Sequence, residues 1–248
     1  MIHADGEGSR EAILISTERK TMAHSHLLDR PIWNALRTRQ SGVAIGNDKA
    51  LRMLAEYGHF AAAADDSIES GAALSALVPA NDLTWFCEVA NRAPPPGTVV
   101  LDSGSAVQMI AQHVDPAHPD FEFVDLTDAD ATEMRQLADI ARPGPFLART
   151  HQLGNFVGVK EDGRLLAMAG ERLKLDGFTE LSAVCTLPDH RGRGLSGNLV
   201  RVLANRILAR GDVPFLHAFA GNTKAISLYL GLGFCRRRYM ALTILGRR

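Results

Sequence analysis

Two glycines alternate with two arginines in the stretch TLPDHRGRGLSGNLVRVLANR, where an apolar strand pattern gives way to a helical one. Glycine weakens a helix, and arginine near a helix N-terminus opposes the dipole, so helix formation does not explain these residues. Gly192, Gly194 and Gly197 fall in the loop and first turn. The first amides of a helix have no internal partner, and small residues leave them accessible to an anion. The stretch therefore predicts an anion site.

Two common phosphate loops do not match this pattern. The Walker loop requires Gly-Lys-Ser/Thr at its end, which is absent from this stretch. The dinucleotide-binding loop follows the first strand of a parallel series, whereas Gly192-x-Gly194-x-x-Gly197 follows several strands of a mainly antiparallel one. Spacing alone leaves ATP, NAD, coenzyme A and a simple tight turn as alternatives.

A second pattern follows about thirty residues later and carries a family resemblance. Residues 191–196, RGRGLS, resemble the R-x-x-G-x-G/A loop of the GCN5-related N-acetyltransferase (GNAT) superfamily, with Ser196 where Gly or Ala is usual. Residues 222–234, NTKAISLYLGLGF, are similar to the superfamily's N-x-x-A-x-x-L-Y-x-x-x-G-F signature, in the variant of the FR47-like group. The resemblance covers residues 121–248 and implies that acetyl-CoA is the cofactor.

The resemblance also implies roles for individual residues. The strand that ends at Thr186 would pair with the pantetheine arm, and a splay beside it would admit the thioester. An amide near Val184 would polarise the acetyl carbonyl, and Asn222 would both cap a helix and contact the cofactor. The residues that would bind the cofactor are Val184, Cys185, Thr186, Arg191, Gly192, Arg193, Gly194, Leu195, Ser196, Gly197, Asn222 and Tyr229.

Four side chains are candidates for the chemistry of transfer. Tyr229 matches the family's general acid, which would protonate the departing thiolate. Glu180 lies two and four residues before Ser182 and Val184 on a predicted strand, so we expect it to face the cleft and act as a base through water. His217 is the second candidate base, and Cys185 raises the alternative of an acyl-cysteine intermediate.

The composition limits the function classes. The 248-residue chain is 46% hydrophobic and has a net charge of −1, which argues against a general nucleic-acid or membrane-surface binder. Residues 186–248 hold 11 Lys and Arg but only 2 Asp and Glu, which agrees with an anionic ligand there. Three widely spaced cysteines, no metal-ligand spacing and no signal or membrane segment favour a cytoplasmic protein without a metal site.

The predicted fold is α/β (α+β), the GNAT fold, with a mixed, mainly antiparallel sheet flanked by helices. We expect a disordered leader at 1–23, a smaller α/β region at 24–118 and the acetyltransferase domain at 119–248; the smaller region resembles a degenerate half-copy of the same fold only weakly. Turn signals predict the order β-α-β-β-β-α-β-α-β from residue 121. In the smaller region, the patterns predict helices at 32–37 and 69–77, and strands at 43–45, 59–64, 83–89 and 98–101.

The resulting hypothesis is an acetyl-CoA-dependent transfer of acetyl to a primary amine, by direct attack in a ternary complex. The acceptor would be a small molecule or a peptide, and a homodimer is left open. The rival hypotheses are a coenzyme A-binding sensor or interaction module without turnover, and a protein that binds ATP or NAD.

Overall fold

The computed structural model describes residues 27–89, 92–117 and 121–247. The predicted leader at 1–23 lies outside these residues. The helices are α2 (Pro31–Arg37), α3 (Ile68–Leu77), α4 (Ala131–Ala141), α5 (Leu195–Ala209) and α6 (Thr223–Gly231). The strands are β1 (Ala44–Gly46), β2 (Ala50–Met53), β3 (Ala61–Ala63), β4 (Thr84–Glu88), β5 (Thr98–Ile110), β6 (Val124–Leu126), β7 (Phe156–Glu161), β8 (Arg164–Leu175), β9 (Phe178–Thr186), β10 (Val213–Phe219) and β11 (Cys235–Arg247).

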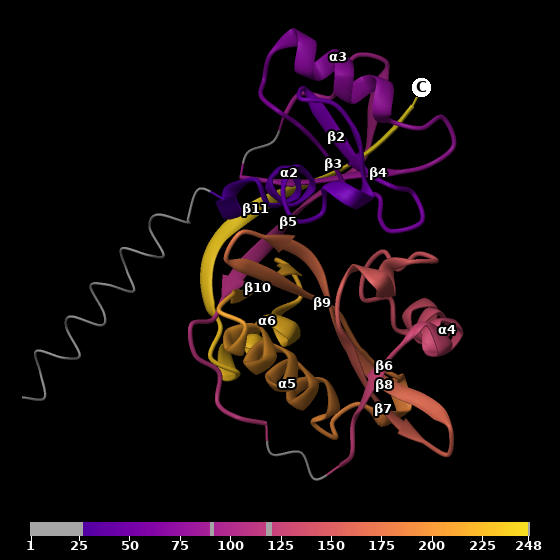
Figure 1. The fold of residues 1–248 in the computed structure, drawn as a ribbon, viewed down its shortest axis with the longest axis vertical. Coiled ribbons are helices and arrows are strands. Elements are labelled where there is room, and N and C mark those ends of the chain that lie inside the picture. The colour runs from indigo at the N-terminus through magenta and orange to yellow at the C-terminus, as the bar shows by residue number, and fades with distance from the viewer. Residues whose placement is uncertain (1–26, 90–91, 118–120, 248) are drawn as a thin grey trace, which may run out of the picture.

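One large sheet organises the molecule. Its strand order is β4-β11-β5-β10-β9-β8-β7-β6, and the described neighbours are antiparallel except for the parallel pair β9 and β10. A second sheet has the order β1-β2-β3. Helices flank the large sheet, with α5 and α4 on either side of β7–β9 (Figure 1). The predicted fold class is confirmed.

The two parts of the chain run in matching order and exchange their last strands. In the first part, β1, β2 and β3 are followed by α3, and a parallel bridge from Phe60 to Trp85 leads to β4. In the second part, β7, β8 and β9 are followed by α5, and a parallel pairing leads to β10. However, β11 pairs with β4, while β5 lies between β10 and β11. In Figure 1, β11 accordingly runs from the lower, orange part to the upper, indigo part.

Apolar faces of the helices hold these layers together. Helix α5 buries Leu195, Leu199, Leu203 and Ile207, which recur at helical spacing along the sequence. Val202 is half-buried. On the other side of the molecule, α2 packs through its apolar residues against side chains from β8 to β11.

The element order predicted from residue 121 onward is confirmed, whereas part of the first region was predicted wrongly. The predicted strand at 98–101 continues as β5 to Ile110, through the sequence Asp-Ser-Gly-Ser that disfavours strands. There β5 is paired with β11, with Ser103 opposite Thr243, and from Ala106 onward its other edge is paired with β10, so tertiary pairing overrides local preference. Strand β2 was not predicted. The division of the chain at residue 118 stays a prediction, and the pairing of β5 crosses it.

The exchange of strands generates a first prediction. A fragment of residues 119–248 loses β5, and with it the partner of both β10 and β11. We expect this fragment to lack a cooperative thermal transition by circular dichroism, because two buried strands expose their hydrogen-bonding edges. A chain of residues 24–248 is the control and should unfold cooperatively. A sharp transition for the fragment alone would show that the exchange is dispensable.

Candidate active site

The two central strands of the sheet separate after a short parallel pairing. The register joins Phe178 to Val213, Thr179 to Pro214 and Glu180 to Phe215. Beyond these residues, β9 continues along β8 and β10 continues along β5. The facing edges of β9 and β10 therefore diverge and leave backbone groups available to a ligand between them.

A bulge in β9 shapes this opening. Met168 lies opposite Cys185, but Gly170 lies opposite Ser182, so β9 carries one extra residue between these pairs. Ala183 adopts the left-handed conformation, with φ of 53°. A bulge leaves its extra residue unpaired and changes the direction of the strand, so it redirects the backbone next to Val184. The alternating pattern of the sequence did not reveal it.

A cavity of about 180 Å³ lies at the opening. Its walls bring together β9, β10, the start of α6, the segment 142–145 and residues from the first part of the chain. Predicted site residues in its lining are Val184, His217, Asn222 and Tyr229; further lining residues include Ile32, Phe60, Trp85, Cys87, Ser182 and Ala183. The sequence predicts that the first part of the chain shapes the acceptor site, but it predicts no individual site residue there.

The loop before α5 leaves the N-terminus of this helix open. Gly192 and Gly194 have φ of 82° and 74°, which favours glycine. Within the described chain, Gly194 precedes the helix without a side-chain cap, and the first helical backbone bond runs from Asn198 to Gly194. The earlier amides are thus free for a phosphate, which the positive end of the helix favours.

The polar side chains of the loop before α5 have different partners. Arg191 is exposed. Arg193 binds Glu161 at 2.5 Å and lies 2.9 Å from His190. The hydroxyl of Ser196 lies 2.5 Å from that of Thr186, so the residue that departs from the family pattern ties the helix to the end of β9.

Tyr229 lies on α6 and lines the cavity, with its ring edge-on to Phe234. Burial, followed by the electrostatic interaction with Cys185, raises the pKa of Tyr229 to about 12. Its phenol is therefore protonated at neutral pH and is able to donate. Asn222 caps α6 by accepting a hydrogen bond from the amide of Ala225 at 3.1 Å, as predicted.

Glu180 is fully buried in an ionic network. Arg172 donates two hydrogen bonds of 2.8 Å to the two carboxylate oxygens, and its guanidinium covers the ring of Phe60. Burial raises the pKa of Glu180, but Arg172 and then His217 outweigh it and lower the value to about 2. The carboxylate does not contribute to the described cavity lining, so Glu180 lies behind His217 rather than in the opening.

His217 connects this network to the cavity. Its Nδ1 lies 2.7 Å from Oε1 of Glu180, and its Nε2 lies 3.0 Å from the amide nitrogen of Gln108. Burial lowers the pKa of His217, but interactions with Cys87 and Glu180 raise it to about 10. Burial also raises the pKa of the Cys185 thiol, to about 12, so Cys185 is protonated and a poor nucleophile.

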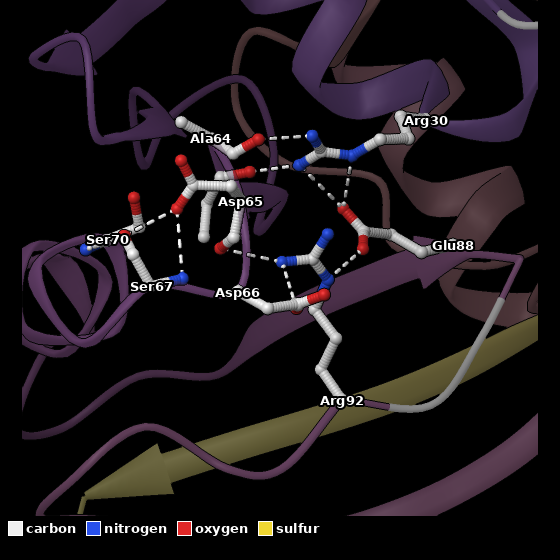
Figure 2. Close-up of polar contacts among 9 residues, drawn as sticks. Arg30, Ala64, Asp65, Asp66, Ser67, Ser70, Glu88 and Arg92 are labelled. Carbon is white, nitrogen blue, oxygen red and sulfur yellow. Dashed lines mark hydrogen bonds and ion pairs between the residues drawn. The ribbon is translucent and has the colours of Figure 1, made fainter.

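A second cavity, of about 580 Å³, lies at the corresponding junction of β3 and α3. Figure 2 shows Arg30 and Arg92 turned toward Glu88, and Asp65 turned toward Ser67 at the start of the helix. Ser67 caps the amide of Ser70, so the helix end is closed by its own side chains. This acidic, capped junction does not fit a diphosphate, which singles out the junction at α5.

Sequence reasoning missed Arg172 and Cys87. The sequence does contain a signal for Arg172. The turn at Asp176-Gly177 pairs the strand before it, which contains Arg172, with the strand after it, which contains Glu180. The sequence contains no such signal for Cys87, because this residue lines the cavity only through the long-range packing of β4.

Comparison with solved structures decides the family. A structure assigned to the GNAT family of acetyltransferases, from Novosphingobium aromaticivorans, is 43% identical, with a TM-score of 0.84 over 89% of this chain and 98% of that chain. The chain belongs to the GNAT family. The resemblance that the two motifs carry is thus confirmed.

Other comparisons agree with this assignment. The family model "FR47-like protein" matches residues 156–241 of this GNAT chain. A GCN5-related N-acetyltransferase from Kribbella flavida shares the fold at 19% identity, with a TM-score of 0.56 over 88% of this chain and 95% of that one. A GCN5-related N-acetyltransferase-like protein from Streptococcus suis does so at 14% identity and 0.53, over 93% and 99%. No curated protein matches the chain.

No helix among the described residues has the length and apolar character to cross a membrane. No group of three or more His, Cys, Asp or Glu side chains among them is placed to hold a metal ion.

The network around Glu180 generates a prediction about pH. Its folded pKa of about 2, against an ordinary 4.5, corresponds to a stabilisation of roughly 3 kcal/mol. Because the pKa is lowered on folding, this stabilisation is present above pH 4.5 and is lost as the pH falls toward 2. We expect Glu180→Gln to lower the free energy of unfolding in urea at pH 7, and the difference from wild type to shrink below pH 4.5.

The matched control is Glu69→Gln, which changes an exposed carboxylate on α3. Its small effect should not vary with pH in this way. A destabilisation by Glu180→Gln that stays constant from pH 7 to pH 3 would contradict an ionised, paired Glu180.

Proposed function

We propose that this GNAT protein transfers acetyl from acetyl-CoA to a primary amine, by direct attack of the amine in a ternary complex. The observation that carries the proposal is the position of Tyr229. A protonated, buried phenol lines the cavity where β9 and β10 diverge, and β9, which borders this cavity, is tied through Thr186 to Ser196 at the uncapped N-terminus of α5. This combination supports anion binding and proton donation at one site.

Coenzyme A would supply the acetyl group as a thioester, and the residues present fit its anionic part. Amides at 195–197 and the guanidinium of Arg191 would bind the diphosphate, since both are directed donors for phosphate. The edge of β9 at Val184, Cys185 and Thr186 would pair with the pantetheine arm. The bulge at Ala183 supports a free amide near Val184 for the acetyl oxygen.

Two proton transfers accompany the reaction. Tyr229 would donate its phenolic proton to the departing thiolate. For the proton of the amine, we propose that the neutral form of His217, held by Glu180, is the base, because the imidazole lines the cavity and its Nδ1 contacts the carboxylate. Since the pKa of His217 is raised to about 10, the rate should increase as the pH rises toward that value. Glu180 is then a positioning residue that stabilises charge on the ring, in place of a direct base.

The first part of the chain would form the acceptor side. Ile32, Phe60 and Trp85 line the cavity from this part. The matching order of β1–β5 and β7–β11 supports the interpretation of residues 24–118 as a degenerate half-copy of the fold. The acceptor is proposed to be a small-molecule or peptide amine. A cytoplasmic location is also a proposal, and the three described cysteines, all unpaired, support it.

Release of free thiol tests the activity. Purified protein with acetyl-CoA and a panel of primary amines should release coenzyme A only when an amine is present. If no amine gives release while calorimetry shows acetyl-CoA binding, the rival of a coenzyme A-binding module replaces this proposal. Thermal stabilisation by ATP or NAD, and not by acetyl-CoA, would favour the nucleotide-binding rival.

Tyr229→Phe tests the general acid. We expect kcat to fall by about 100-fold or more, because the thiolate leaves without a proton. The KM for acetyl-CoA should change little, since the ring still packs. Tyr239→Phe, at an exposed position on β11, is the control and should retain the wild-type rate. A Tyr229→Phe protein with full activity would remove this residue from the mechanism.

Arg191→Ala tests the diphosphate contact. We expect the KM for acetyl-CoA to rise by about tenfold or more, as the loss of a charge-assisted hydrogen bond implies. Arg135→Ala, at an exposed position on α4, should leave KM unchanged. Equal KM values for the two variants would place Arg191 outside the cofactor site.

A further inference from the structure

The cavity at the junction of β3 and α3, here called the α3 cavity, has no part in the function proposed above. Its volume of about 580 Å³ exceeds that of the cavity at the candidate active site, which is about 180 Å³. Cavities that bind small organic ligands have volumes of roughly 300–1,000 Å³. The α3 cavity therefore has room for an organic molecule of that class.

The α3 cavity is separate from the candidate active site. Side chains alternate along a strand, and in β4 Cys87 lines the smaller cavity whereas Phe86 and Glu88 line the α3 cavity. In β11, Leu242 lines the smaller cavity and Thr243 lines the α3 cavity. The two cavities thus lie on opposite faces of the same two strands, and a ligand in one does not occupy the other.

Part of the wall of the α3 cavity is apolar. Leu74 of α3, Phe86 of β4 and Leu245 of β11 line it and belong to one buried apolar cluster. Pro94 and Pro95 also contribute to the lining. Removal of apolar ligand surface from water against such a wall is favourable, so the cavity suits a ligand with an apolar body.

Both arginines in the described lining of the α3 cavity already have partners (Figure 2). Arg30 donates to the backbone carbonyls at 63–64 and to Glu88. Arg92 donates to Glu88 and pairs with Asp66 at 2.7 Å. An anionic ligand would have to displace these partners, so the arginines do not favour an anion.

Asp65 differs from the other carboxylates of the lining. Asp29, Asp66 and Glu88 each pair with an arginine, whereas no arginine or lysine of the described chain forms an ion pair with Asp65. Its Oδ1 accepts hydrogen bonds from the backbone amide of Ser67 at 3.0 Å and from the hydroxyl of Ser67 at 2.5 Å. These hydrogen bonds, and first that of the hydroxyl, hold the pKa of Asp65 well below its usual range. Asp65 is therefore charged at neutral pH and is able to bind a cation.

We propose that the α3 cavity is a second ligand site, which binds an organic cation with an apolar body. The ammonium group of the ligand binds the carboxylate of Asp65, and its apolar body packs against Leu74, Phe86 and Leu245. An apolar wall beside a carboxylate without an ion pair is complementary to this class of ligand in shape and in charge.

The experiment uses the full chain without acetyl-CoA. The probe is N,N-dimethyl-2-phenylethylamine, a tertiary amine that is cationic at neutral pH and cannot form an amide. Calorimetry should show saturable binding of this probe. Two compounds with the same ring, neutral 2-phenylethanol and anionic 3-phenylpropanoate, should bind about tenfold or more weakly, because a charge-assisted hydrogen bond is about twice as strong as a neutral one.

Gly71→Leu tests the location of binding. Gly71 lines the cavity on α3, and a Cβ added there meets no atom within 4 Å. Leucine is a better helix former than glycine, so this variant should keep the wild-type stability while its side chain fills the cavity and abolishes saturable binding of the probe. The control is Gly231→Leu on α6, where an added Cβ also meets no atom within 4 Å. It should bind the probe as wild type does.

Asp65→Asn tests the charge. The amide oxygen of the variant still accepts hydrogen bonds from Ser67, but the negative charge is lost. We expect the Kd for the amine to rise by about tenfold or more, as the loss of a charge-assisted hydrogen bond implies, and the Kd for 2-phenylethanol to stay the same. The control is Glu69→Gln, which removes an exposed carboxylate outside the described lining and should change neither Kd.

The outcomes concern this site alone. Absence of saturable binding to wild type, or equal binding to wild type and Gly71→Leu, overturns the inference. Equal affinities for the three compounds, or an unchanged Kd for the amine in Asp65→Asn, overturns the assignment of a cation. None of these measurements involves acetyl-CoA or turnover, so such a failure leaves the proposed function unaffected.

Discussion

The parallel pairing of β9 with β10 ends at Glu180 and Phe215, and the site depends on this limit. The outer edges of the two strands stay paired, with β8 and with β5, so neither strand frays. Their inner edges separate within a continuous sheet. The bulge at Ala183 turns the backbone at the point of separation. A rigid sheet thus contains a gap in which backbone groups remain unpaired, which is what a ligand that adds to a strand requires.

The closed end of this gap contains a buried charge that the fold has to compensate. Glu180 lies at the last register pair, and Arg172 neutralises it from the neighbouring strand. Removing one partner of such a pair leaves an uncompensated charge and costs about 3–5 kcal/mol. The same carboxylate orients His217. One network therefore stabilises the junction of the two strands and positions the imidazole at the base of the cavity.

The two strand-to-helix junctions occupy similar positions in the fold but differ in charge and in helix capping. The junction at α5 has glycines with positive φ, arginines and an uncapped helix end. The junction at α3 has Asp65, Asp66 and Glu69, and Ser67 caps its helix. The exchange of β5 and β11 joins the two parts of the chain, so the junction at α3 remains part of the fold although this junction does not fit a diphosphate. Its structural contribution is to place Phe60, Trp85 and Cys87 against the cavity of the first.

The sequence by itself determined the glycine loop at 191–197, the cap at Asn222, the position of Tyr229 and the element order from residue 121. These features depend on residues that are close in the chain, where turn chemistry and periodicity act. Only the tertiary structure decided that Glu180 is buried behind His217, that β5 lies between β10 and β11, and that Cys87 reaches the cavity. Each of these features depends on pairing between segments far apart in sequence, and burial by such partners overrides the local pattern. The alternation that predicted a cleft-facing Glu180 gives no indication of its ion pair with Arg172 or of the bulge at Ala183.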